Sequence, residues 1–340
     1  MRSGDPRSDT LTIGVVGVGH LGTFHLQKYA VHPAVSCLVV YDLDAGRAQQ
    51  TADSLESVYP LTIAGELEEC LESCDAVSVA VPTAAHAEVV ARALQAGCHV
   101  LVEKPIASDS ENAWALVGAA EEAGRVLHVG HVERFNPALQ GLEEEKIVPG
   151  FIEAHRLAPY NPRGTDVPVV IDLMVHDLDL ILHLVGEEPT EIHATGVPVI
   201  TSTVDIANVR LSFPGGCVSN VTASRVALTS MRKLRVFQPQ AYLSIDLLQG
   251  KRELIRLRDR TDRMGEGEIP IMELAGRVIT RREFQGERDA LAMEIDAFLH
   301  AVRAREAGAK PPSPSTGVTG REAASALALA EEITRRIASG

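Results

Sequence analysis

Residues 11–22, LTIGVVGVGHLG, decide the fold of the first part of the chain. The apolar start of this stretch is typical of a fully buried parallel strand, and residues 20–30 then read as a helix. Between the two, Gly17 permits a tight turn, Gly19 lets the backbone approach a pyrophosphate, and Gly22 packs the helix against the strand. Because unpaired N–H groups at a helix start attract phosphate, the stretch predicts a dinucleotide-binding turn.

A carboxylate follows the next strand of this pattern. The apolar run 36–41 ends at Asp42, about 20 residues after the last of the three glycines, where a carboxylate can accept hydrogen bonds from the adenosine ribose. It also repels a 2′-phosphate, so we expect NAD rather than NADP, with His20 and Leu21 as further residues of the cofactor loop. The structural alternative is that Asp42 only begins the turn into a helix over 44–57.

Strands and helices continue to alternate up to residue 130, which predicts a doubly wound parallel sheet of the α/β class. The expected elements are strands over 76–81, 99–102 and 126–130 and helices over 84–96 and 108–123. Ligands of such sheets bind beyond the carboxyl ends of the strands. We therefore expect the nicotinamide half of the cofactor near Pro82, Thr83, His86, Glu103 and Lys104. For His86, a purely structural role is an equal alternative.

The pattern changes after residue 130, and we predict two domains. A NAD-binding Rossmann domain covers 1–130, and an α+β domain for substrate binding and oligomerisation covers 131–340. In the second domain we expect a helix near 137–145 and a poorly ordered loop over 251–268. Strand candidates separated by tight turns indicate a large, mostly antiparallel sheet; they are 150–157, 190–198, 204–213, 217–224, 232–238 and 242–248. One face of this sheet has no cover within the chain, which favours a homodimer or homotetramer.

One predicted helix of the second domain, 169–185, carries a polar stripe. At about 100° per residue, four of its five polar side chains fall on one side of the helix, and they are Asp172, His176, Asp179 and His183. Burying such groups is costly unless they are paired, so we expect the stripe to line an active-site cleft between the domains. A buried pair of Asp172 and His176, or a metal site of His176, Asp179 and His183, are alternatives. For His183 alone we expect a structural role.

The composition excludes several classes of function. The net charge of −14 argues against nucleic acid or an anionic membrane as a partner. No apolar stretch is long enough to span a bilayer, and residues 1–10 lack the hydrophobic segment of a signal peptide. The five scattered cysteines contain no CxxC motif, which argues against a disulfide framework or a zinc site. We therefore expect a cytoplasmic protein with a small-molecule substrate and no metal.

Several motifs taken together resemble one family. VGVGHLGTFH, VPTAAH, GCHVLVEKPIA, GHVERFNPA and IDLMVHDLDLILHLVG, in this order, look like the Gfo/Idh/MocA family of sugar and polyol dehydrogenases. The resemblance ends at GREAASALALAEEITRRIASG and covers nearly the whole chain. Its most specific part is the Glu-Lys-Pro coupled to a downstream Asp-x-x-x-His. VDIANVRL, NVTASR and KLRVFQPQAYLSID are similar to the branch that oxidises UDP-N-acetylglucosamine at carbon 3.

The resemblance implies a catalytic group of Lys104, Asp172 and His176. It implies NAD-dependent oxidation of a ring hydroxyl of a nucleotide sugar, with UDP-N-acetylglucosamine giving its 3-keto form. A neutral imidazole is suited to remove the hydroxyl proton near neutrality, and Asp172 can orient it. Lys104 can hydrogen-bond the reacting oxygen or share the proton, and the sequence does not decide whether His176 or Lys104 is the base.

A nucleotide sugar carries two phosphate charges, which arginine forks match well. The candidate substrate-binding residues are Arg134, Asn136, Arg156, Tyr160, Arg163, Arg225 and Arg232. Three alternatives stay open. The chain can be a dehydrogenase of a free sugar or inositol, a non-catalytic regulator that senses NAD or a sugar, or a glycosidase that works through transient oxidation.

Overall fold

The computed structural model describes residues 10–161, 167–287, 289–309 and 317–339. The chain divides into two compact units, the first of Met1–Val132 and Leu291–Ser325, the second of Glu133–Ala290 and Ala326–Gly340. The predicted boundary after residue 130 lies close to the observed one, but a simple division at that point is wrong for the segment Leu291–Ser325. That segment returns to the first unit, where Ile295, Phe298, Leu299 and Val302 join the buried core.

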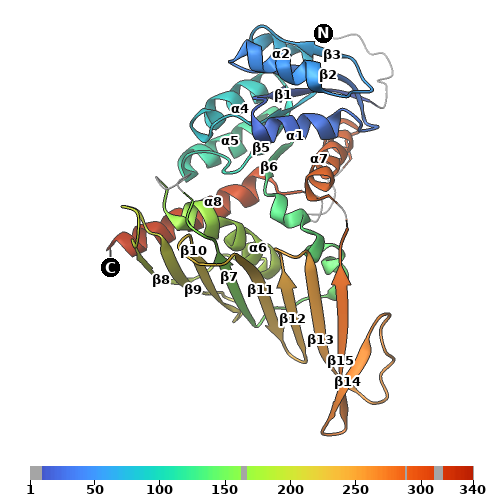
Figure 1. Ribbon diagram of the computed structural model, residues 1–340, viewed down its shortest axis with the longest axis vertical. Helices are drawn as coiled ribbons and strands as arrows, with labels where there is room; N and C mark the ends of the chain where they lie inside the picture. Colours follow the sequence, from blue (N-terminus) through green and yellow to red (C-terminus); the bar gives the residue numbers. More distant parts are fainter. Residues whose placement is uncertain (1–9, 162–166, 288, 310–316, 340) are drawn as a thin grey trace. The chain divides into compact units, whose positions relative to one another are not determined.

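A parallel sheet of six strands forms the first unit, in the order β3-β2-β1-β4-β5-β6 (Figure 1). Its strands are β1 (Leu11–Val16), β2 (Val35–Tyr41), β3 (Leu61–Ile63), β4 (Ala76–Val79), β5 (His99–Glu103) and β6 (Leu127–Gly130). Its helices are α1 (His20–Tyr29), α2 (Ala45–Ser54), α3 (Leu67–Ser73), α4 (His86–Gln95), α5 (Ser110–Ala123) and α7 (Ala290–Glu306). The predicted doubly wound α/β fold is confirmed. The sequence pattern missed β3 and α3, which are too short to show a clear period.

The strand order determines where a ligand of this unit binds. From β1 the chain goes outward to β2 and β3, then returns to the other side of β1 and continues through β4, β5 and β6. The order in which strands are added thus reverses between β1 and β4. Parallel sheets bind ligands at such a switch point, beyond the carboxyl ends of the strands. β1 can occupy the centre because Ile13, Val15 and Val16 are almost completely buried.

His128 on β6 makes the stability of the first unit depend on pH. Burial lowers the pKa of this imidazole from 6.5 to about 4. As pH falls below 6.5, His128 becomes protonated in the unfolded chain but stays neutral in the folded chain until the pH approaches 4. The free energy of unfolding should therefore fall by about 2 kcal/mol between pH 7 and pH 5. Urea unfolding followed by the fluorescence of Trp114, the single tryptophan, measures this change in the first unit. A His128→Gln variant with the same pH dependence would contradict the assignment.

The second unit contains a sheet of nine strands, in the order β14-β15-β13-β12-β11-β7-β10-β9-β8 (Figure 1). The strands are β7 (Phe151–Leu157), β8 (Glu191–Val197), β9 (Ile206–Ser212), β10 (Val218–Ser224), β11 (Met231–Gln238), β12 (Ala241–Asp246), β13 (Lys251–Asp259), β14 (Ile269–Leu274) and β15 (Arg277–Gln285). Among the described residues of this sheet, β7 and β10 pair in parallel and the other neighbouring strands pair antiparallel, so the predicted, mostly antiparallel sheet is confirmed.

Two predictions for the second unit are wrong. The segment 137–145 forms two short 3-10 turns, Pro137–Leu139 and Leu142–Glu145, because Gly141 between them takes a left-handed conformation with φ of +70°. The segment 251–268 is not a poorly ordered loop over its whole length, since its first half is strand β13. Arg252 on this strand is buried with its guanidinium 3.9 Å from the ring centre of Phe284, so a charge-rich sequence still forms an interior strand.

Helices cover one face of the large sheet. Apolar side chains of α6 (Val175–Val185) and of the last part of α8 (Gly320–Ser339) form one core cluster with the inner residues of β7, β9, β10, β11 and β12. Along β7 the residues alternate between buried and half-buried, so the opposite face of the sheet is the more exposed one. Among the described residues, no helix has the length and apolar character needed to cross a membrane.

Candidate active site

The turn between β1 and α1 has the form that its three glycines predict. Gly17 has a φ of +87°, which favours glycine, and a Cβ there would lie 2.8 Å from the carbonyl oxygen of Ala80. A Cβ on Gly22 would lie 1.8 Å from the carbonyl oxygen of Gly17, so α1 packs on the turn only with glycine at this position. Around Gly19 no described atom lies within 4 Å of the Cβ position, which leaves its backbone open to a bound group.

The first turn of α1 adjoins this open backbone. Gly19 is the N-cap residue, no side chain among the described residues caps the helix, and the first turn holds no acidic residue. Its N–H groups and the helix dipole therefore favour an anion. His20 and Leu21 are exposed at this turn, and the ring of His20 packs edge-on against Phe24 with centroids 4.7 Å apart. These features fit a pyrophosphate.

Asp42 follows β2 and reaches back to the same turn. Its Oδ2 accepts a hydrogen bond from the N–H of Val18 at 2.9 Å, and its Oδ1 accepts one from the N–H of Asp44 at 2.9 Å. Nη1 of Arg47 approaches the two oxygens at 3.5 and 3.4 Å. The carboxylate is thus fixed beside the glycine turn, where it suits the ribose hydroxyls, and it also forms the turn into α2.

The residues after β4 and β5 lie at one edge of the first sheet. These strands pair in register from Ala76 with His99 to Val79 with Val102. After β4, Pro82 is exposed, Thr83 is half-buried and His86 is buried at the start of α4. Glu103 ends β5 and Lys104 follows it, both half-buried, and a cis peptide bond joins Lys104 to Pro105. The predicted nicotinamide-side residues therefore belong to two neighbouring strand ends.

Asp172 and His176 lie on one continuous helical segment of the second unit. It opens with a π-helical turn, Val170–Met174, and continues as α6. Such turns accommodate an extra residue and often occur at functional sites. Asp172 belongs to the π turn and His176 to the first turn of α6, and both side chains are half-buried, so each keeps some surface for contact with a ligand.

The predicted polar stripe is not continuous along this helix. Asp179 is 1% exposed, and its carboxylate accepts hydrogen bonds from Nε and Nη2 of Arg134 at 2.7 and 2.9 Å. His183 is exposed. Placing Asp179 along an open cleft is therefore wrong, because helical periodicity shows which residues share a side but not which partner meets them. The described residues contain no group of three or more His, Cys, Asp or Glu that could hold a metal ion.

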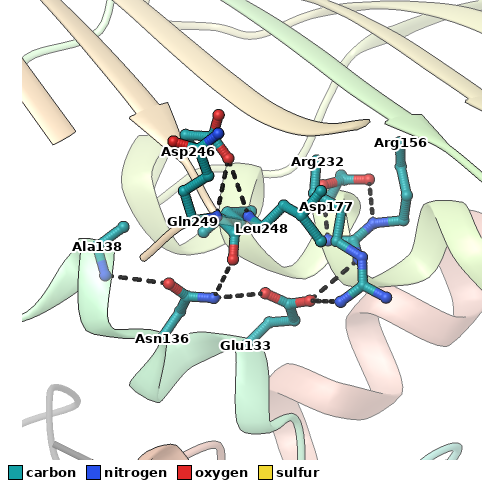
Figure 2. Close-up of polar contacts among 10 residues, drawn as sticks. Glu133, Asn136, Ala138, Arg156, Asp177, Arg232, Asp246, Leu248 and Gln249 are labelled. Carbon is teal, nitrogen blue, oxygen red and sulfur yellow. Dashed lines mark hydrogen bonds and ion pairs between the residues drawn. The ribbon is translucent and has the colours of Figure 1, made fainter. Parts of the chain in front are cut away.

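Arg156 is the centre of a buried group of charges (Figure 2). Its Nε and Nη2 donate to the carboxylate of Asp177 at 2.8 and 3.1 Å, and its Nη1 donates to Oε1 of Glu133 at 3.1 Å. Nη1 of Arg232 donates to the same oxygen of Glu133 at 3.1 Å. Burial by itself lowers the pKa of Arg156, but the two carboxylates raise it above its ordinary value, so the guanidinium stays charged.

The predicted substrate-binding residues differ in exposure. Arg156 and Arg225 are 3% and 5% exposed, whereas Tyr160 is 45% exposed and the side chain of Arg232 is 48% exposed. Nε of Arg225 lies 3.9 Å from Oδ1 of Asp205. Arg232 and Tyr160 therefore present polar surface to a ligand, while Arg156 and Arg225 face the interior.

Asn136, Arg134 and Arg163 complete the set of candidates. Asn136 donates to Oε2 of Glu133 at 3.2 Å and to the carbonyl of Leu247 at 2.9 Å, so it joins the group in Figure 2. Arg134 is held by Asp179, with its side chain 8% exposed. Arg163 lies outside the described residues.

The sequence pattern missed the two carboxylates that organise these arginines. Asp177 lies off the predicted stripe, and Glu133 stands in the motif GHVERFNPA without a role assigned to it. One signal for Asp177 was present, since a charged residue between apolar neighbours of a buried helix needs a partner. The identity of that partner, Arg156 on β7, follows only from the packing of the helix on the sheet.

Models of known families match parts of both units. The model described as "Oxidoreductase family, NAD-binding Rossmann fold" matches residues 11–131, and the "GFO/IDH/MocA C-terminal domain" matches residues 153–243. The UDP-N-acetylglucosamine 3-dehydrogenase of Acidithiobacillus ferrooxidans is 40% identical over 311 residues, 91% of this chain and 92% of that protein. An inositol 2-dehydrogenase of an Arthrobacter species is 31% identical over 202 residues, 54% of this chain and 57% of that protein.

The solved structures agree with these matches. The structure of UDP-N-acetylglucosamine 3-dehydrogenase GnnA from Acidithiobacillus ferrooxidans superposes with a TM-score of 0.82 at 36% identity, covering 97% of this chain and 98% of that one. The likeness includes both units and not the Rossmann unit alone, so the resemblance expected from the sequence motifs is confirmed. This chain belongs to the Gfo/Idh/MocA family of oxidoreductases.

Proposed function

We propose that this protein is an NAD-dependent dehydrogenase that oxidises the C3 hydroxyl of UDP-N-acetylglucosamine to a ketone. The observation that carries the proposal is the identity of 40% over 91% of the chain to a protein named for that reaction. The matched inositol 2-dehydrogenase aligns with only 54% of the chain. Since fold alone does not determine the substrate, the extent of the likeness in the second unit is the deciding argument.

NAD would be held by the turn of Gly17, Gly19 and Gly22 and by Asp42, and when bound it accepts the hydride. The other parts of the reaction fall to side chains of this chain. His176 is suited to take the hydroxyl proton, and Asp172, one helical turn earlier, can orient the imidazole and stabilise its charged form. Lys104 can hydrogen-bond the reacting oxygen. Either His176 or Lys104 can act as the base.

Arg232 is the best candidate for the diphosphate of the substrate. Its side chain is half exposed, and its Nη1 contact with Glu133 holds one edge of the guanidinium. A guanidinium fixed in this way can present its remaining N–H groups to phosphate oxygens without losing much rotamer freedom on binding. Tyr160, also exposed, is available to stack on a base or sugar ring.

The direct test is NADH formation by the purified protein with NAD and UDP-N-acetylglucosamine, compared with free N-acetylglucosamine, glucose and myo-inositol. The proposal expects turnover with the nucleotide sugar at far higher kcat/KM than with the free sugars. Activity confined to a free sugar or inositol would overturn the substrate assignment and leave the dehydrogenase. Binding of NAD without turnover of any of them would instead favour a regulator that senses NAD or a sugar, and release of a free sugar without net NADH would favour glycoside cleavage.

Replacing Asp42 by Ala should weaken the selection of NAD. The variant loses the acceptor for the ribose hydroxyls and frees Arg47, which can then meet a 2′-phosphate. We expect the ratio of kcat/KM for NAD to that for NADP to fall by about 10- to 100-fold, the effect of losing one or two charge-assisted hydrogen bonds. Asp53→Ala, which removes an exposed carboxylate of α2 that accepts a hydrogen bond from Gln49 at 2.8 Å, is the matched control and should keep the ratio. An unchanged ratio in Asp42→Ala would leave Asp42 as a turn residue only.

We also infer that the protein forms a homodimer or homotetramer through the more exposed face of the large sheet. On this face Phe151, Phe237 and Tyr242 form a row across three strands, with ring centroids 5.7 and 4.8 Å apart. The edge strand β14 adds exposed apolar side chains, namely Ile269, Ile271, Met272 and Leu274. Exposed aromatic rows and apolar sheet edges are typical of surfaces that a partner covers. Analytical ultracentrifugation tests this directly, and a monomer at micromolar concentration would contradict it.

A further inference from the structure

Two buried histidines hold the segment Glu103–Pro105 from either side of Lys104. His25 on α1 donates from Nε2 to Oε1 of Glu103 at 2.8 Å. His86 at the start of α4 contacts the carbonyl oxygen of Pro105 with Nδ1 at 2.7 Å. Each histidine is only 1% exposed, and the two come from different helices of the first unit. The residue before Lys104 and the residue after it are thus both anchored by an imidazole.

The contact of His25 is the end of a chain of hydrogen bonds with a definite direction. Since the carboxylate of Glu103 only accepts, Nε2 of His25 carries the proton. Nδ1 of His25 lies 3.2 Å from Oγ of Ser78, whose oxygen lies 2.8 Å from the hydroxyl of Tyr29. Tyr29 can donate to Ser78 and Ser78 to His25, so each member of the chain is satisfied while the imidazole is neutral. Ser78 and Tyr29 are completely buried, which makes this arrangement rigid.

The neighbouring strand β6 leaves room for the carboxylate of Glu103. A Cβ on Gly130 of the neighbouring strand β6 would lie 3.0 Å from Oε2 of Glu103, so the absence of a side chain there makes room for the carboxylate. Glu294 of α7 is also buried in this unit, and burial together with the charge of Glu103 raises its pKa well above the ordinary value.

His86 connects the ends of the neighbouring strands β4 and β5. Its Nε2 lies 2.9 Å from the carbonyl oxygen of Val81, just after β4, and its Nδ1 contacts Pro105, just after β5. Both partners are backbone carbonyl oxygens, which only accept, so a neutral imidazole donates to one of them and contacts the other. The ring therefore fixes the path of the chain and not a side chain. His86 thus lies in direct contact with both strand ends.

We propose that His25 and His86 are positioning residues for Lys104. His25 holds the side chain of Glu103 before it and His86 the backbone carbonyl of Pro105 after it, so that the ammonium group of Lys104 meets the reacting oxygen. The proposal rests on the proposed dehydrogenase function. His25 has a further consequence, because it lies on α1, the helix whose first turn favours the pyrophosphate. It therefore connects the cofactor-binding turn with the segment that carries Lys104. A displacement of about 1 Å at a reacting group can cost a hundredfold in rate, which gives such anchors a measurable effect.

The test compares His25→Leu, His25→Gln and His86→Leu with a matched control. We expect kcat to fall by about 10- to 100-fold in the two Leu variants, with the KM for NAD little changed, as misplacement of a catalytic group predicts. His25→Gln keeps one donor and one acceptor and should recover part of kcat. The control is His99→Leu at the start of β5, since His99 is equally buried and bonded to Glu306 at 3.0 Å but lies at the opposite end of the strand. It should lower stability and keep kcat.

Hydrogen exchange of the peptide covering residues 101–107 provides a second measurement that needs no turnover. We expect faster exchange in this peptide for His25→Leu and His86→Leu than for the wild-type protein and His99→Leu, under conditions where all of them are folded. Equal kcat losses in all Leu variants, or unchanged exchange of this peptide, would overturn the proposal. If the wild-type protein turns over no substrate, the proposed function fails, while the exchange measurement still decides whether the two histidines hold this segment.

Discussion

Replacing either His176 or Lys104 by Ala should reduce kcat for NADH formation by about 10²- to 10⁴-fold, the usual contribution of a positioned acid or base. Loss of His176 removes the imidazole that Asp172 can orient, and loss of Lys104 removes the ammonium group that can bind the reacting oxygen. Neither change touches the glycine turn or Asp42, so NAD should still bind. Steady-state NADH absorbance gives kcat, and calorimetric titration gives the affinity for NAD.

His193→Ala is the control for this prediction, because His193 is an exposed histidine on strand β8 of the same unit as His176. It should leave kcat at the wild-type level. If His176→Ala keeps more than a tenth of the activity, His176 is not the base, and Lys104 alone would carry the proton. If both variants keep it, the catalytic assignment carried by the Glu-Lys-Pro and Asp-x-x-x-His motifs is wrong.

Replacing Asp177 by Leu should be among the most destabilising single changes in the second unit. It leaves the guanidinium of Arg156, 3% exposed, without its two-bond partner. Breaking a buried ion pair costs about 3–5 kcal/mol, and because Glu133 still faces Arg156 we expect a loss of about 3 kcal/mol in the free energy of unfolding. Urea unfolding followed by circular dichroism measures this loss, and Trp114 fluorescence, which reports on the first unit, should shift less.

The double variant Arg156→Met with Asp177→Leu tests the cause of that loss. It replaces both charges by apolar groups, so the double variant should be more stable than Asp177→Leu alone. Arg260→Ala breaks an exposed pair with Glu273 and should change the free energy of unfolding by less than about 1 kcal/mol. If the double variant is no more stable than the single one, the loss comes from packing around Asp177 and not from the unpaired charge of Arg156.

The sequence by itself determined the glycine turn and most of the sheet of the first unit, but not β3, α3 or the return of Leu291–Ser325 to this unit. A strand with the glycine turn after it, then Asp42, then the repeated strand–helix pattern can form only a parallel sheet with a dinucleotide site at its edge. Local chemistry is sufficient here, because each glycine has a steric reason that depends on residues close in the chain or on the next strand of the same pattern. A Cβ on Gly22 would lie 1.8 Å from the carbonyl oxygen of Gly17, which shows how little freedom that turn leaves.

Only the tertiary structure decided how the charged residues of the second unit are used. Helical periodicity placed Asp179 on the same side of the helix as His176, yet Asp179 binds Arg134. The match between guanidinium and phosphate made Arg156 a candidate phosphate ligand, yet Arg156 binds Asp177 and Glu133. Tertiary contacts also decided that the charge-rich segment of β13, for which we predicted a loop, forms a strand. They likewise gave His25 its partner Glu103, which lies 78 positions further along the chain. The physical reason is common to all of them. A buried charge is stable only with a partner, and that partner comes from a distant part of the chain that no local pattern specifies.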